Sequence, residues 1–162
     1  MSTQDITRAE IDEFLARDAW LLDTWQLDAW LRLFSPQARY QVPSTDRPAG
    51  DPVGSLYLID DDYRQLCFRV KRFNLPQGHA EQPHSLTQRL VTNVLLHGER
   101  DGALDVTAAF LIARTRHGLQ DHFVGRYELR LVNDDGALKF VQRRAILAMP
   151  GLRQVGTVSI IV

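Results

Sequence analysis

The side chains best suited to acid–base chemistry are two aspartates, two tyrosines and a histidine within the first hundred residues. They are Asp18, Asp23, Tyr40, Tyr63 and His97. A buried carboxyl group beside an imidazole or phenol can acquire a pKa suited to proton transfer, so these residues are a candidate catalytic site if the fold gathers them. Burying a charge costs free energy unless the charge is paired. We therefore favour a capped or surface role for Asp18, although it falls on the apolar stripe of a predicted helix.

Patterns typical of a metal site are weak. The histidines are His79, His84, His97, His117 and His122, of which the first two form the nearest pair. They lack the helical H-E-x-x-H or paired Cys/His spacing that holds ligands rigidly, so solvated histidines are the interpretation we favour. The acidic run 60–62 lacks the glycine at the bend that hard-cation loops need. Acids before an apolar helical pattern are more typical of a helix start.

Length and composition favour one ordinary globular domain over residues 1–162, with 44% hydrophobic and 24% charged residues. The net charge of −1 provides no general attraction for nucleic acid or anionic membrane. The single cysteine, Cys67, can form no internal disulfide and cannot by itself hold an iron–sulfur cluster. We expect it to be a buried structural thiol in a cytoplasmic protein. The N-terminus has no signal-peptide pattern, and no apolar run reaches the roughly 18 residues of a membrane span.

Three helices are predicted from apolar residues spaced three and four apart. The segment Thr7-Arg8-Ala9-Glu10 has the form of a capping box, so the first helix should begin there. A second, short helix is predicted from Leu27 to Phe34, ended by Ser35-Pro36. A third is expected between Asp61 and Arg72. The first helix should bury one apolar stripe, formed by Ile11, Phe14, Leu15, Leu22 and Trp25.

Strands dominate the remainder of the sequence. A short strand is predicted over 38–42, followed by a Pro- and Gly-rich loop over 43–54. After Pro83 apolar residues recur at every second position, as is typical of strands. Three Gly-containing breaks divide this part of the sequence and predict four long antiparallel strands. We expect Gly125 to mark a bulge or kink in one of them. Helices first and strands afterwards predict an α+β domain, with a curved antiparallel sheet wrapped around the N-terminal helices.

Tryptophans and arginines also form suggestive series. Trp20, Trp25, Trp30 and Phe34 could line a pocket for a flat substrate, but the spacing of the last three is that expected of a helix core. The strand arginines Arg126, Arg130, Arg143 and Arg144 could suggest an anion site. With Glu128 among them and a near-neutral chain, a solvated or protein-contacting face is the interpretation we favour.

Six segments, in order, resemble those of the β subunits of aromatic-ring-hydroxylating dioxygenases. They are 28–40 (DAWLRLF…ARY), 61–72 (DD…L…RVKR), 87–94 (T…LVTNV), 123–128 (FVGRYE), 143–147 (RRAIL) and the apolar end 158–162. The chain departs from this family near Leu86, Gln88 and Arg89, where arginines at the first two positions and a histidine at the third would be expected. Any partner contact made by those family residues therefore does not carry over to this chain.

The resemblance implies a conical fold like that of nuclear transport factor 2, and a non-catalytic subunit that supports a catalytic α subunit in aromatic-compound catabolism. It also implies an α3β3-type hexamer, a trimer of this chain, and a Rieske [2Fe-2S] cluster and mononuclear iron held by the partner. No cofactor is expected in this chain. We expect the subunit interface to include His122, Arg126, Glu128, Arg130 and Arg144. The alternative is a stand-alone dehydratase or isomerase that uses the cone interior as an acid–base pocket.

Overall fold

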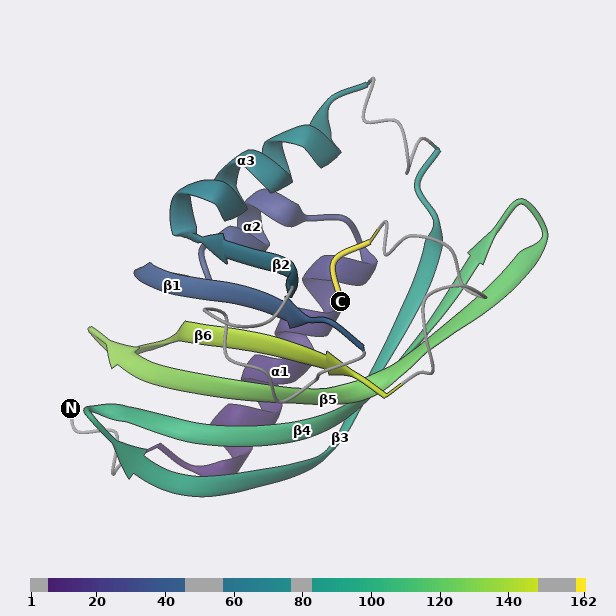
Figure 1. The fold of residues 1–162 in the computed structure, drawn as a ribbon. Helices are drawn as coiled ribbons and strands as arrows, with labels where there is room; N and C mark the ends of the chain where they lie inside the picture. Colours follow the sequence, from purple (N-terminus) through teal and green to yellow (C-terminus); the bar gives the residue numbers. More distant parts are fainter. Residues whose placement is uncertain (1–5, 46–56, 77–82, 149–159) are drawn as a thin grey trace.

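The computed structural model describes residues 6–45, 57–76, 83–148 and 160–162. Its centre is a six-stranded sheet in the order β2-β1-β6-β5-β4-β3. Neighbouring strands are antiparallel except β1 and β6, which are parallel. The sheet curves around helix α1, and the end of the chain lies inside the curve (Figure 1). The predicted α+β cone is confirmed, with six strands where the sequence indicated a main group of four.

Helix α1 (Arg8–Asp23) begins at the predicted capping box, in which the Thr7 side chain accepts from the Glu10 main chain. Its end differs from the prediction, because Trp25 lies beyond the helix. The helix closes with two main-chain bonds, from Trp25 N to Leu22 O and from Gln26 N to Leu21 O. This is a Schellman motif, in which glycine usually occupies the left-handed position. Here Trp25 adopts φ 56°, so the usual sequence signal for the helix end was missing.

The next elements begin and end differently from the prediction. Helix α2 (Leu27–Leu31) is short, and Phe34, expected in the helix, is the first residue of strand β1 (Phe34–Pro43). The Phe140 amide donates to Leu33 O at 2.8 Å, so the chain already pairs with β6 at that point. Of the loop predicted over 43–54, residues 46–54 lie outside the described residues.

Strand β2 (Tyr57–Asp62) was not predicted, because its acidic end resembled a helix start. Only Asp62 has that role, as the N-cap of helix α3 (Tyr63–Asn74). Asp60 and Asp61 still belong to the strand, where acidic residues are uncommon. Arginines compensate both charges: Asp60 pairs with Arg39 at 2.8 Å, and Asp61 pairs with Arg69 at 2.5 Å.

The four long strands after Pro83 form the predicted antiparallel meander. They are β3 (Leu86–Arg100), β4 (Ala103–Arg116), β5 (Leu119–Asp134) and β6 (Ala137–Leu147). In β5 the odd-numbered residues from Phe123 to Leu131 face inward and the even-numbered residues face outward.

Gly125 is not at a bulge, because the register of β5 shifts only between Arg130 and Leu131. The glycine is needed for close packing. A Cβ atom at this position would lie 2.1 Å from Ile146 O and 2.8 Å from the Phe110 ring.

Candidate functional site

The interior of the cone contains two buried ion pairs, each between an aspartate of α1 and an arginine of the sheet. Asp18 pairs with Arg143 of β6 at 3.0 Å, and Asp23 pairs with Arg89 of β3 at 2.5 Å. All four side chains are at most 9% exposed. A buried charge is tolerated when it is paired and hydrogen-bonded, so these pairs show how the fold accepts acids on a core-facing helix.

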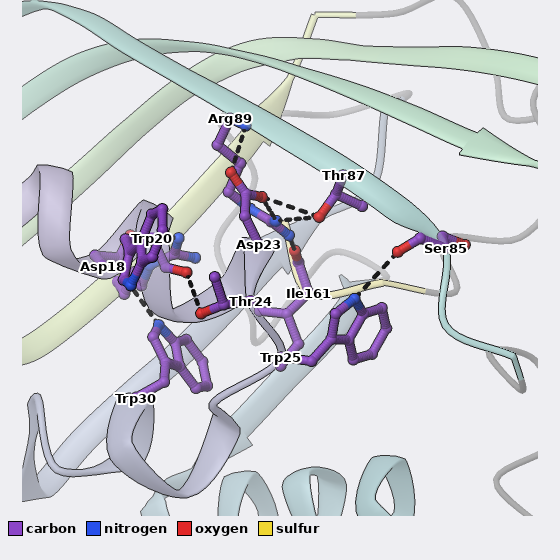
Figure 2. Close-up of polar contacts among 11 residues, drawn as sticks. Asp18, Trp20, Asp23, Thr24, Trp25, Trp30, Ser85, Thr87, Arg89 and Ile161 are labelled. Atoms are coloured by element: carbon purple, nitrogen blue, oxygen red, sulfur yellow. Dashed lines mark hydrogen bonds and ion pairs between the residues drawn. The ribbon is translucent and has the colours of Figure 1, made fainter.

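We had expected Asp18 to be capped or on the surface. This expectation is wrong, because Asp18 is only 1% exposed. Its carboxylate accepts hydrogen bonds from Trp30 Nε1 at 2.7 Å and from Arg143 Nη2 at 3.0 Å. Figure 2 shows the Trp30 indole pointing at this carboxylate. Sequence reasoning considered the charge without its partner, which lies 125 positions away in the chain.

Arg143 was expected on a solvated or protein-contacting face, and this expectation is wrong. Its side chain is 0% exposed and is surrounded by aromatic rings. The guanidinium carbon lies 4.5 Å from the centroid of Tyr127, with three further rings within 6 Å: Trp30, Tyr40 and Phe140. Desolvated cation–π contacts of this kind stabilise a buried cation. The neighbouring Arg144, one residue along the strand, faces the opposite side of the sheet because side chains alternate.

Burial and the ion pair act in opposite directions on Arg143. Burial is the largest single effect and disfavours the guanidinium charge, but the Asp18 carboxylate, together with the neighbouring phenols of Tyr127 and Tyr40, outweighs it and raises the pKa of Arg143 above its usual range. For Tyr40 burial dominates and raises the pKa of the phenol to about 12, with the Arg143 charge opposing the shift. A phenol in this state remains protonated at neutral pH. The interior therefore contains a fixed cation and a neutral hydroxyl group.

The second pair is part of a denser set of hydrogen bonds at the end of α1. Asp23 accepts from the Thr87 hydroxyl at 2.9 Å and from the Arg89 main-chain amide at 2.8 Å, in addition to the Arg89 guanidinium. Figure 2 shows Thr87 and Arg89 converging on this carboxylate from strand β3. Nearby, Trp25 Nε1 donates to Ser85 O at 3.1 Å. These bonds attach the C-terminal end of α1 to the edge strand.

The end of the chain occupies the remaining space between the two ion pairs. Ile160, Ile161 and Val162 are each at most 4% exposed. Arg89 donates to Ile161 O, and Arg143 donates to Val162 O. The Tyr40 hydroxyl donates to Val162 O at 3.1 Å and accepts from Val162 N at 3.2 Å. One guanidinium nitrogen of each arginine and the Tyr40 hydroxyl are thus engaged by the protein's own backbone.

Little empty volume is left beside this segment. The cavity lined by Leu22, Trp25, Leu27, Thr87, Arg89, Ile160 and Ile161 has a volume of about 10 Å³. A single water molecule needs about 10–15 Å³ measured in this way. This part of the cone is consequently filled, and a substrate could enter it only if the end of the chain moved out.

Two of the five candidate acid–base residues, His97 and Tyr63, do not join Asp18. His97 is exposed on β3 and contacts Thr107 Oγ1 at 2.8 Å. Tyr63 begins α3, where burial and the neighbouring Cys67 raise the pKa of its phenol. Cys67 itself is half-buried, not fully buried as predicted. Asp18, Asp23 and Tyr40 do lie in the interior, but the arginines, Trp30 and the chain end take up their polar atoms.

Within the described ranges, no three His, Cys, Asp or Glu side chains are arranged to hold a metal ion. His84 stacks on Trp25 with ring centroids 4.0 Å apart, and His117 contacts Arg116. His122 is exposed, whereas His79 lies outside the described residues. Of the helices that the structure describes, none is both long and apolar enough to cross a membrane.

Four of the predicted interface residues form charge clusters on the outer face of the sheet. Glu128 contacts Arg126 at 3.3 Å and Arg144 at 3.5 Å. Arg130 belongs to a neighbouring cluster, in which it pairs with Asp105 at 3.0 Å. His122 lies further along β5, opposite Ala113 of β4. The four β5 residues are separated by even numbers of positions, so their side chains lie on the same face of the sheet. Arg144 of β6 lies opposite Glu128, so the structure places all five residues on that face.

Sequence reasoning missed three parts of the interior: the partnership of Arg89 with Asp23, the burial of Arg143, and the position of residues 160–162. Alternation along β6 was a usable signal for Arg143, because Ala145 and Leu147 lie two and four positions further along and are buried. For Arg89 and the chain end no local pattern pointed inward.

Comparison with known proteins agrees with the geometry. Residues 17–154 match the family model described as "Ring hydroxylating beta subunit". The small oxygenase component of the p-cumate 2,3-dioxygenase system of Pseudomonas putida is 40% identical over 165 residues, covering 99% of this chain and 92% of that protein.

Solved structures show the same fold. The β subunit of benzoate 1,2-dioxygenase from Burkholderia mallei superposes with a TM-score of 0.77 at 25% identity, covering 91% of this chain and 93% of that one. A scytalone dehydratase candidate from Novosphingobium aromaticivorans superposes with a TM-score of 0.63 at 15% identity, covering 86% and 82%. The latter likeness concerns the fold alone.

Proposed function

The chain belongs to the ring-hydroxylating dioxygenase β-subunit family, and from this premise we propose that it is a non-catalytic subunit supporting a catalytic α subunit. The assembly would oxidise an aromatic compound during its catabolism in the cytoplasm. The α subunit would hold the Rieske [2Fe-2S] cluster and the mononuclear iron. A trimer of this chain within an α3β3-type hexamer is the assembly we propose, formed by one domain spanning residues 1–162.

The burial of Asp18 and the filled space beside residues 160–162 are the observations that carry the non-catalytic role. A stand-alone dehydratase or isomerase would need a solvent-accessible pocket around its proton-transfer group. In this chain Asp18 is 1% exposed and is bonded to Trp30 and Arg143. A buried carboxylate that is bonded at both oxygens cannot accept a substrate proton without weakening its buried ion pair. The interior therefore favours a role in stability over a role in catalysis.

The outer face of the sheet supports the assembly role. Its described clusters contain Arg126, Arg130 and Arg144 together with Glu128 and Asp105. The Arg126 side chain is 57% exposed, so it is available to a partner. Arginine is enriched at protein interfaces, where its guanidinium can form paired hydrogen bonds to carboxylates. We propose that His122, Arg126, Glu128, Arg130 and Arg144 contact a neighbouring subunit that offers complementary acidic groups.

Charge reversal on this face tests the proposal. Arg126→Glu should lower the fraction of chain found in the hexamer when α and β subunits are produced together, because like charges would meet across the interface. Arg8→Glu, at a 54% exposed position on α1, is the matched control and should assemble normally. Sedimentation velocity measures the assembled fraction, and turnover per assembled hexamer is measured on the same samples. A strictly monomeric chain, both alone and with the α subunit, would contradict the assembly role.

A further inference from the structure

The contacts that hold residues 160–162 come from three strands and are directed at the main chain. Tyr40 of β1, Arg89 of β3 and Arg143 of β6 bind the oxygens of Ile161 and Val162 or the amide of Val162. Both arginines have their charge balanced by an aspartate of α1. Each guanidinium therefore donates both to its aspartate and to a main-chain oxygen of the segment.

This arrangement is unusual for ordinary core packing. Three apolar residues could be buried against apolar walls alone, and a buried ion pair often contributes less stability than a well-packed apolar replacement. Here two such pairs are present, and both hold the same short segment. Directional donors at two successive residues select one register of an extended chain, which apolar packing does not do.

The walls around the segment select apolar side chains of limited size. Leu22, Trp25 and Leu27 face Ile160 and Ile161, and the cavity left between them has a volume of about 10 Å³. Larger side chains would not fit without displacing the wall, and smaller ones would leave empty space. Hydrogen bonds to the main chain of the segment and a close apolar fit are together the elements by which proteins recognise an extended peptide.

We propose that the interior of the cone is a peptide-binding site for a short apolar segment in extended conformation, and that residues 160–162 are its built-in ligand. The site takes a segment with β-branched side chains, whose successive main-chain oxygens meet Arg89 and Arg143. This role is distinct from the assembly function and does not rest on it. Because the ligand is tethered, its effective concentration is high, and a free peptide should bind only when the tethered segment is weakened.

The test uses the 162-residue chain with Ile160→Gly and Ile161→Gly together, which keeps the backbone donors and acceptors of the segment but removes its apolar side chains. The probe is the peptide acetyl-Ser-Ile-Ile-Val, which carries the sequence of residues 159–162. We expect saturable binding at millimolar peptide and a rise in Tm of roughly 2–5 °C. Nuclear Overhauser effects from the peptide methyl groups to the Trp25 indole and Leu22 methyls would locate the peptide in the interior.

Two controls separate specific recognition from surface adsorption. The peptide acetyl-Ser-Gly-Gly-Val should not raise the Tm, and the wild-type chain should bind neither peptide. Adding Tyr40→Phe to the double variant should weaken binding about 3- to 10-fold, because the hydroxyl contacts Val162. Should the double variant not fold alone, the Ile-Ile peptide should raise its refolding yield, and Ile161→Ala provides a milder background for the same titration. Equal effects of both peptides, or no binding in either background, would overturn the proposal.

Discussion

Replacing Asp18 by asparagine removes one charge from the most deeply buried ion pair. Asp18 accepts from Trp30 at 2.7 Å and from Arg143 at 3.0 Å, and the Arg143 side chain is 0% exposed. The asparagine amide could still accept from Trp30, but the guanidinium would lose its counter-charge in a site without solvent. Breaking a buried pair in this way costs about 3–5 kcal/mol in the free energy of unfolding. For a chain of this size the Tm should fall by roughly 6–20 °C.

The matched control is Asp12→Asn, which breaks an exposed pair on the same helix. Asp12 bonds Arg8 at 2.9 Å, and the two side chains are 49% and 54% exposed. Solvent screening limits such a pair to about 0–1 kcal/mol. Urea denaturation followed by far-UV circular dichroism measures both variants, at one fixed protein concentration because self-association would raise the apparent stability. The structure therefore predicts a difference of at least about 2 kcal/mol between two chemically identical substitutions.

Two results would refute this reasoning. If Asp18→Asn were no more destabilising than Asp12→Asn, the Arg143 charge would not depend on Asp18. If Asp18→Asn assembled normally with the α subunit but lost the 10²- to 10⁴-fold in turnover typical of a removed proton-transfer group, Asp18 would be catalytic. We expect turnover per assembled hexamer to stay within a few-fold of wild type.

Two further predictions concern Tyr40 and Gly125. Burial raises the pKa of Tyr40 to about 12 from its ordinary value of 10.0, so between those pH values the folded chain binds more protons than the unfolded chain and stability falls as pH rises. Over that window wild type should lose about 3 kcal/mol more than Tyr40→Phe, as urea unfolding at each pH would show, and identical slopes would exclude the shift. Gly125→Ala forces a Cβ to 2.1 Å from Ile146 O and should cost at least ~1–3 kcal/mol. An unchanged urea midpoint for this variant would show that β5 and β6 can move apart to accommodate the Cβ atom without loss of stability.

Local patterns were sufficient for most of the fold. The capping box at Thr7 predicted the start of α1, since its two hydrogen bonds involve residues only three apart. The alternation from Phe123 to Leu131 predicted which face of β5 is buried, because the strand period is two wherever one face meets a core. The two main errors arose from residues that are uncommon at their positions. Trp25 adopts the left-handed conformation that glycine usually has at a helix end, and Asp60 and Asp61 lie in a strand, where acidic residues are uncommon.

The candidate site was less accessible to such reasoning. The sequence alone identified Asp18 as an acid on an apolar stripe, and indicated a family whose α partner would contain the metals. Tertiary structure decided that this acid meets Arg143, that Asp23 meets Arg89, and that residues 160–162 lie between the two pairs. A helix or strand is set by contacts a few residues apart, whereas a buried charge is acceptable only beside its counter-charge. Here the partners are separated by 66 and 125 positions, so only the folded chain brings them together.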